Sequence, residues 1–256
     1  MSDYVTETDA LQVSVNAGVL TVTLNRPDAL NAFRPEMLTG LATLLRQADD
    51  DAEVAAVVLQ GAGRAFSAGV DLKVLQGIDP EAGKIGDVFD MPARDVRCAI
   101  REIGKPVIAK VHGFCFTGAL EIALHCDFIY TTEKTKFGDT HAKFGLRPTW
   151  GMSQTLAQAV GIRRAKELSF TARTLTGVQA VEWGLANEAV ADQGALDALV
   201  AERVAAIAKN SQASVAAFKD LYNLAQDGRS IGDALDEEGN RVYSDITDTA
   251  ERLAGF

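Results

Sequence analysis

The sequence predicts an α/β fold in which a parallel sheet precedes a largely helical C-terminal region. Residues 54–59 form a continuous apolar run of strand length, and residues 107–111 and 126–131 are two further mostly apolar segments, a pattern typical of strands buried on both faces. Helical patterns lie between these runs, so strands and helices alternate, and βαβ units with right-handed crossovers are expected. Beyond about residue 150 the patterns are almost all helical.

The elements before the first buried strand begin with a β-hairpin. Residues 11–15 and 19–24 are rich in β-formers and flank a short Asn-Ala-Gly turn. Residues 35–48 carry apolar side chains at helical spacing, and a proline at the first position suits the start of that helix. Residues 61–86 are punctuated by glycines and are predicted to form a long loop.

The later elements are mostly helices. One is predicted over residues 94–103, where Gly104 and Pro106 end it, and a short apolar helix is predicted over residues 118–124. Neither an internal repeat nor a low-complexity linker interrupts the sequence. The remaining predicted helices cover residues 152–160, 163–171, 176–183, 195–209, 214–225 and 231–253.

Composition and charge exclude several classes of protein. The 256 residues include 25 Lys and Arg against 35 Asp and Glu, and the net charge of -10 comes without a basic stripe. Such a chain is not expected to bind nucleic acid or an anionic membrane. No apolar run approaches the roughly 20 residues that span a bilayer, and the N-terminus lacks a signal-peptide pattern. Three cysteines without CxxC spacing indicate a reduced, cytoplasmic setting.

Several familiar motifs are absent when each position is compared with the residue that the motif requires. A dinucleotide-binding GxGxxG beginning at Gly61 would need glycine where Phe66 stands. A nucleophile elbow around Ser67 would need glycine in place of Ala65, and no Walker A sequence is present. A zinc site is not expected, because the candidate ligands lie on apolar segments without the usual spacing: His112, Cys115, His125 and Cys126.

Two glycine-containing segments, residues 64–73 and 112–121, each follow a buried strand. In an open α/β sheet, ligands bind beyond the carboxyl ends of the strands, where such segments lie. The backbone N–H groups of Val70 and Gly118 are candidates for two donors in one pocket, and Gly118 opens a helix whose first amides lack helical partners. Two such donors form an oxyanion hole for a thioester oxygen. Either segment alone would suit a plain tight turn, but the two together favour the oxyanion site.

Three blocks of sequence resemble the crotonase superfamily, the enoyl-CoA hydratase/isomerase family, in order and spacing. They are LNRPDALNA at residues 24–32, AFSAGVDLK at residues 65–73 and KPVIAKVHGFCFTGALEIALHCD at residues 105–127. Later short matches extend the resemblance over roughly residues 11–245. The resemblance implies a spiral ββα core that binds acyl-CoA over residues 1–195. It also implies a C-terminal helical trimerisation region over residues 196–256 and a homotrimer or homohexamer.

The resemblance also assigns site residues. Val70 and Gly118 match the oxyanion donors, and Glu121 matches the first of the two catalytic glutamates of enoyl-CoA hydratases. Glu121 lies three positions after Gly118 on the same short helix, so both can face one pocket. The acyl-CoA is the substrate, and no separate cofactor is implied. The residues expected to contact CoA or substrate are Arg26, Ala68, Gly69, Asp71, Leu72, Lys73 and Trp150.

Two positions depart from the family pattern. The second glutamate of a Phe-x-x-Pro-Glu motif is replaced by His141, with Asp139 nearby as an alternative acid or base. Histidine transfers protons near neutral pH, so His141 is predicted to be the second catalytic group. Trp150 replaces a small residue beside the pocket and indicates a modified acyl site.

These residues predict an enoyl-CoA hydratase, a lyase that stabilises a thioester enolate and adds water to a 2-enoyl-CoA. Two other enzymatic reactions use the same oxyanion site: isomerisation of the double bond, and hydrolysis of a C–C bond with water activated by histidine. A member of a different class would bind acyl-CoA without turnover. The presence of Glu121 argues against that last reading, because a buried carboxylate without a role is costly.

Overall fold

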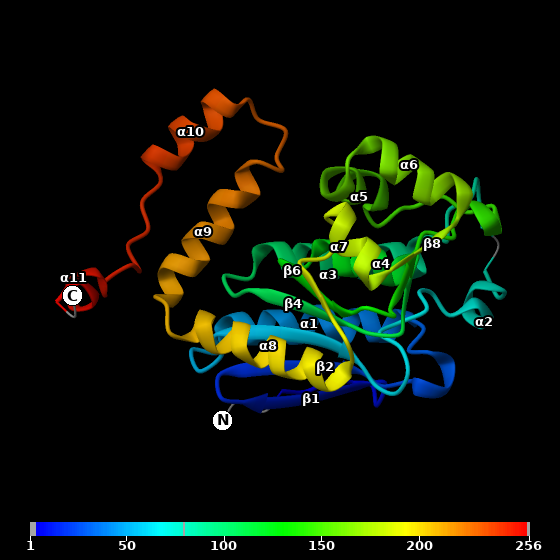
Figure 1. The fold of residues 1–256 in the computed structure, drawn as a ribbon, viewed down its shortest axis with the longest axis horizontal. Coiled ribbons are helices and arrows are strands. Elements are labelled where there is room, and N and C mark those ends of the chain that lie inside the picture. Colours follow the sequence, from blue (N-terminus) through cyan, green and yellow to red (C-terminus); the bar gives the residue numbers. More distant parts are fainter. Residues whose placement is uncertain (1–3, 79, 255–256) are drawn as a thin grey trace.

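The computed structural model describes residues 4–78 and 80–254, and a six-stranded sheet lies at its centre (Figure 1). The strand order is β1-β2-β3-β4-β6-β9, and only the β1–β2 hairpin is antiparallel. This arrangement confirms the predicted α/β class with a parallel sheet. The strands are β1 (Leu11–Asn16), β2 (Val19–Leu24), β3 (Ala56–Gly61), β4 (Val107–Val111), β6 (Phe128–Thr132) and β9 (Glu188–Val190).

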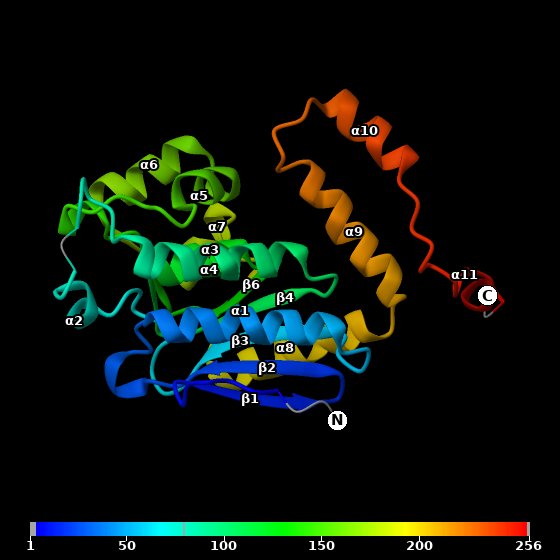
Figure 2. The same cartoon turned by 180° about the vertical axis from the view of Figure 1, so that it is seen from behind.

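Helices cover both faces of the sheet because the central strands are apolar on both sides. Helices α1 (Pro35–Asp50) and α3 (Asp87–Glu102) lie on one face, and α8 (Gln193–Ala208) lies on the other (Figure 2). Successive side chains of a strand point to opposite faces. In β3, accordingly, Val57 and Leu59 join the core beneath α1 and α3, whereas Ala56 and Val58 pack toward α8.

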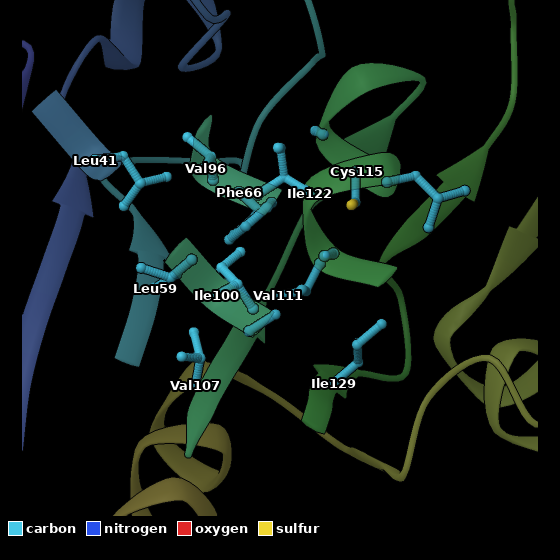
Figure 3. Packing of buried hydrophobic residues seen from close by; sticks show 14 of the residues in the cluster. Leu41, Leu59, Phe66, Val96, Ile100, Val107, Val111, Cys115, Ile122 and Ile129 are labelled. Atoms are coloured by element: carbon cyan, nitrogen blue, oxygen red, sulfur yellow. The ribbon is translucent and has the colours of Figure 1, made fainter. Parts of the chain in front are cut away.

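The larger core supports the loops at the carboxyl ends of the strands. Figure 3 shows Phe66 in close packing with Val96, Ile100 and Ile122. Phe66 is 1% exposed and belongs to one of the two glycine-containing segments. Burial of a phenylalanine stabilises the fold by about 2–3 kcal/mol, so the segment that carries Val70 is anchored to the core.

A second, three-stranded sheet holds the remaining parts of the site. Its order is β5-β7-β8, with β5 and β7 parallel. The sequence analysis did not predict these short strands, because three residues are too few to show a period. The strands and the helices beside them are β5 (Phe114–Phe116), β7 (Lys136–Gly138), β8 (Thr174–Thr176), α4 (Gly118–His125), α5 (Met152–Val160), α6 (Ile162–Thr171) and α7 (Gly177–Trp183).

Two predicted elements before β4 depart from the prediction by more than a shift of one or two residues. Helix α3 starts seven residues before the predicted start at residue 94, after Gly86 with a φ of 84°, and it contains Pro92. The predicted loop over residues 61–86 contains the short helix α2 (Leu72–Leu75). Two single-turn helices complete this part of the fold: η1 (Pro27–Ala29) and η2 (Ala142–Phe144).

The last three helices, which begin with α9 (Gln212–Leu224), extend away from the sheet and are here called the arm (Figure 1). The prediction of one helix over residues 231–253 is wrong: α10 (Ile231–Asn240) and α11 (Thr249–Leu253) are separated by an irregular segment. Within this segment Tyr243 donates a hydrogen bond to Asp220 Oδ2 at 2.7 Å. Asp220 lies on α9 (Gln212–Leu224), so the chain folds back on α9 instead of continuing as a helix.

The predicted domain boundary between residues 195 and 196 falls within α8. Leu196, Leu199 and Val200 of this helix pack against the sheet, whereas the arm begins after it. The division into two domains therefore stays a prediction. Among the described helices, none combines the length and apolar character that crossing a bilayer requires.

Candidate active site

The two glycine-containing segments lie side by side beyond the carboxyl ends of the central strands β3 and β4. The N–H of Ser67 donates to the Phe114 carbonyl at 3.0 Å, and the N–H of Phe116 donates to the Ser67 carbonyl at 3.2 Å. Gly69 has a φ of 95°, and a Cβ at this position would lie 2.8 Å from the Phe116 carbonyl oxygen and 3.5 Å from Gly118 N. The close approach of the two backbones therefore requires glycine at position 69.

The predicted oxyanion donors are both available. Gly118 is the first residue of α4, and neither its N–H nor that of Val70 donates to an acceptor among the described residues. Thr117, immediately before the helix, has a φ of 53° and a ψ of -114°. A β-branched residue in this conformation costs about 1–3 kcal/mol, and such strain is typical of functional sites. The turn at Thr117 starts α4, and it places the free N–H of Gly118 beside the segment of residues 64–73.

Glu121 lies one turn into α4, with its carboxylate buried. It is 1% exposed, and its Oε1 accepts hydrogen bonds from the backbone N–H groups of Trp150 at 3.0 Å and Met152 at 3.1 Å. Burial raises the pKa of Glu121 to about 7, although His141 and the two backbone donors oppose the rise. The carboxylate is therefore fixed in orientation and partly protonated near neutral pH.

His141 faces Glu121, as the sequence predicts. Its Nε2 lies 3.6 Å from Glu121 Oε2, and the residue is 8% exposed. The loop that carries it is tied to α4, because the hydroxyls of Thr140 and Thr117 are 2.5 Å apart and the Thr140 N–H donates to Thr117 Oγ1 at 3.3 Å. A gap of 3.6 Å is too wide for a direct hydrogen bond, and one water can contact both atoms.

Trp150 forms a rigid wall next to Gly118. A Cβ on Gly118 would lie 2.6 Å from Trp150 Cζ3, so the indole packs directly against the start of α4. The ring is 4% exposed, and its Nε1–H donates to Asp90 Oδ1 at 3.0 Å. Thr149 donates to the same oxygen at 2.6 Å. Sequence reasoning missed Asp90, because it lies in the first turn of α3, which the predicted helix did not include.

The predicted CoA-binding segment continues from the backbone amide of Val70 into α2. Asp71 is 5% exposed, accepts from the Lys73 N–H at 3.0 Å and pairs with the Arg26 guanidinium at 2.8 Å. Arg26 also donates to the Ala32 carbonyl at 2.6 Å, so it braces the segment from within. Lys73 is exposed, and its ammonium makes no ion pair with a described residue.

Ala68, Gly69 and Leu72 complete the predicted CoA-binding set. Ala68 and Gly69 precede Val70, and the Ala68 N–H donates to the Leu30 carbonyl at 2.9 Å. Leu72 is 50% exposed at the start of α2. At the end of this segment, the apolar side chain of Leu72 and the cationic side chain of Lys73 are both exposed.

The two other histidines have backbone partners. His112 Nε2 lies 3.0 Å from the Gly63 carbonyl, and His125 Nε2 lies 2.7 Å from the Trp150 carbonyl. Burial lowers the pKa of both rings. Within the described ranges, no three His, Cys, Asp or Glu side chains are placed to hold a metal ion.

Comparison with known proteins shows the family of the chain. The sequence model of the enoyl-CoA hydratase/isomerase family matches residues 14–255. The chain belongs to this family. The crotonase resemblance seen in the three sequence blocks is confirmed, while the roles of individual residues remain predictions.

Relatives within the enoyl-CoA hydratase/isomerase family are similar over most of their length. "Probable enoyl-CoA hydratase 1, peroxisomal" of Arabidopsis thaliana is 36% identical over 231 residues, which cover 90% of this chain and 83% of the relative. "Short-chain-enoyl-CoA hydratase" of Clostridium acetobutylicum is 35% identical over 67% of this chain and 65% of its own. The crystal structure of an enoyl-CoA hydratase from Bacillus anthracis superposes with a TM-score of 0.85 at 28% identity, covering 96% of this chain and 94% of that one.

Proposed function

We propose that this chain is an enoyl-CoA hydratase that adds water to the double bond of a short-chain 2-enoyl-CoA. The observation that carries the proposal is the placement of His141 Nε2 3.6 Å from the Glu121 carboxylate, next to two free backbone donors. Two proton-transferring groups beside an oxyanion site are what conjugate hydration requires.

The reaction starts with the thioester oxygen between the N–H groups of Val70 and Gly118. These donors stabilise the enolate that forms when water adds to Cβ, and loss of one such donor typically costs about 3–4 kcal/mol. His141 Nε2 takes a proton from the water, and protonated Glu121 gives its proton to Cα. The product is a 3-hydroxyacyl-CoA.

The proton balance then returns the site to its starting state. After addition, His141 is an imidazolium and Glu121 a carboxylate, 3.6 Å apart. The proton on Nε2 passes to Glu121 Oε2 through the next water that enters the site. The pKa of Glu121, raised to about 7 by burial, suits this exchange at neutral pH because the carboxyl is populated in both forms.

Trp150 supports the choice of a short acyl chain. Its indole packs against Gly118 and is held there by Asp90, while its backbone N–H donates to Glu121. The acyl group of a thioester bound at the oxyanion amides extends toward this wall. The printed name of the Clostridium relative, a short-chain-enoyl-CoA hydratase, is consistent with that substrate class.

Lys73 is the residue that we propose contacts a CoA phosphate. It is exposed at the end of the segment that contains Val70, and no described side chain neutralises it. A free ammonium beside the site supplies the local positive charge that an otherwise acidic chain needs for a polyanionic ligand. Direct contact of Arg26 with the ligand stays a prediction, because its guanidinium already pairs with Asp71.

The arm supports a homotrimer or homohexamer. Several of its large apolar side chains are exposed: Phe218 by 61%, Tyr222 by 73%, Ile231 by 78% and Leu235 by 61%. Exposed apolar surface of this extent favours association. Light scattering should give the mass of three or six chains of 27.3 kDa, and a monomer at micromolar concentration would contradict the proposal.

Cysteine usage supports a cytoplasmic location. Cys98, Cys115 and Cys126 are all free thiols. Fractionation of the source cells, with the protein followed by antibody, would test this; enrichment in an organelle would contradict it.

Hydration is tested by following the conjugated absorbance of but-2-enoyl-CoA in water, with mass spectrometry of the product. Hydration adds one water to the mass, isomerisation leaves the mass unchanged, and C–C hydrolysis splits the acyl group. Separate Glu121→Gln and His141→Ala variants should each lower turnover at least about 100-fold. The matched control is His112→Asn, a buried histidine bonded to Gly63, which should retain activity. Binding of the ester without any turnover would sink the proposal and favour a non-catalytic member.

A further inference from the structure

His141 is held from two sides. Its ring Nδ1 lies 2.7 Å from Asp139 Oδ1, while Nε2 is the nitrogen that faces Glu121. The backbone N–H of His141 donates to the same Asp139 oxygen at 3.1 Å. One oxygen of the Asp139 carboxylate thus accepts from the backbone of His141 and contacts its ring. These two contacts leave the imidazole little freedom to rotate.

Asp139 itself is buried and ionised. It is 2% exposed, and burial alone would raise the pKa of its carboxyl. Hydrogen bonds from His141 and from the Ser169 side chain on α6 outweigh that effect and hold the pKa of Asp139 below its ordinary value. A carboxylate can only accept hydrogen bonds, so the atom that faces it at 2.7 Å must carry a hydrogen.

The other tautomer would be costly in this geometry. With the hydrogen on Nε2, the Nδ1 lone pair would face the Asp139 carboxylate at 2.7 Å and lose the hydrogen bond within a buried site. Nε2 would then have no lone pair with which to accept a proton from water. The orientation of the ring and the position of its proton therefore depend on the same carboxylate.

We propose that Asp139 is a positioning residue that keeps the proton of His141 on Nδ1, so that Nε2 is the atom that exchanges protons with water and Glu121. The inference deepens the hydratase proposal and rests on it for its catalytic consequence. Asp139 need not touch the substrate, because its effect passes through the histidine.

The first test needs no substrate. The chain contains only three histidines, so ¹⁵N NMR of the labelled protein resolves each ring, and His141→Gln identifies the signals of His141. The neutral ring of His141 should carry its hydrogen on Nδ1. A neutral ring protonated on Nε2 overturns the inference, whatever reaction the protein catalyses.

The second test uses Asp139→Asn, which preserves the side-chain size and can turn its amide toward Nδ1. We expect kcat to fall at least about 10-fold with KM changed less than about threefold, and the His141 tautomer to shift to Nε2–H. Unchanged kcat, or loss of kcat with the tautomer retained, overturns the positioning role. Asp51→Asn is the control, since it removes a carboxylate that is 9% exposed and bonded to Tyr4.

These two tests separate this inference from the proposed function. If the protein hydrates no enoyl-CoA, the hydratase proposal is wrong. The position of the proton on the His141 ring in the wild-type protein still tests the inference about Asp139. If Asp139→Asn does not fold, the NMR result on the unchanged protein carries the decision alone.

Discussion

Replacement of Glu121 by glutamine should stabilise the protein at neutral and alkaline pH while it removes activity. The carboxyl is buried, with a pKa raised from 4.5 to about 7, and burial is the main cause. An unfolded chain restores the ordinary pKa. The folded state therefore holds this proton more tightly than the unfolded state does, and the linkage between proton binding and folding gives the sign of the effect.

The sign follows from the raised value. The contribution of Glu121 to stability is fully present below about pH 4.5, falls as the pH rises through the window from 4.5 to about 7, and is lost above it. The difference of about 2.5 pH units corresponds to about 3 kcal/mol, at about 1.4 kcal/mol per unit. Between pH 5.5 and pH 8 the loss is about 2 kcal/mol by the same relation.

Glutamine keeps the acceptor that Trp150 and Met152 need and cannot ionise. The unfolding free energy of Glu121→Gln should therefore exceed that of the wild type, and the excess should grow by about 2 kcal/mol from pH 5.5 to pH 8. Urea unfolding at a series of pH values, followed by tryptophan fluorescence, measures both curves.

The matched control is Glu133→Gln, which neutralises an exposed carboxylate and should give a difference that does not change over this range. The reasoning is refuted if the Glu121→Gln difference is also constant with pH, or if the variant is less stable than the wild type at pH 8. A site that gains stability when its catalytic group is removed is typical of enzymes, because function requires a costly buried charge.

Three further predictions concern the surroundings of this carboxylate. Trp150→Leu should shift the ratio of kcat/KM for medium-chain over short-chain enoyl-CoA upward by at least about 10-fold, and an unchanged ratio would contradict the acyl-wall role. Gly118→Ala should lower the unfolding free energy by about 1–3 kcal/mol through contact with that indole, and the double variant Gly118→Ala/Trp150→Leu should recover part of the loss in a urea titration. Arg26→Ala should destabilise the protein by at least about 1 kcal/mol, because the longer contact to Arg34 is then the remaining ion pair of buried Asp71; equal urea midpoints would refute that role.

In the arm, the sequence pattern predicts one helix where the structure has two. Helical spacing of apolar residues continues through residues 231–253, yet the chain leaves the helix after Asn240. Arg241 and Tyr243 bind Asp220 on α9, and these contacts outweigh local helix propensity. A partner more than twenty residues away leaves no trace in local periodicity, so the break could not be predicted.

The sequence by itself determined the fold class and the two glycine-containing segments that carry Val70 and Gly118. These depend on local patterns, namely apolar runs of strand length and glycines that follow them. The prediction that Glu121 and His141 act as a pair came from the family resemblance.

Only the tertiary structure decided the surroundings of these side chains. Burial raises the pKa of Glu121 against the opposing effect of the backbone donors at residues 150 and 152. Asp139 Oδ1 lies 2.7 Å from His141 Nδ1, and the Trp150 indole is bonded to Asp90, sixty residues earlier in the chain. Burial and hydrogen-bond partners are supplied by segments distant in the chain, so the residue types alone leave the charge, orientation and reach of the site open.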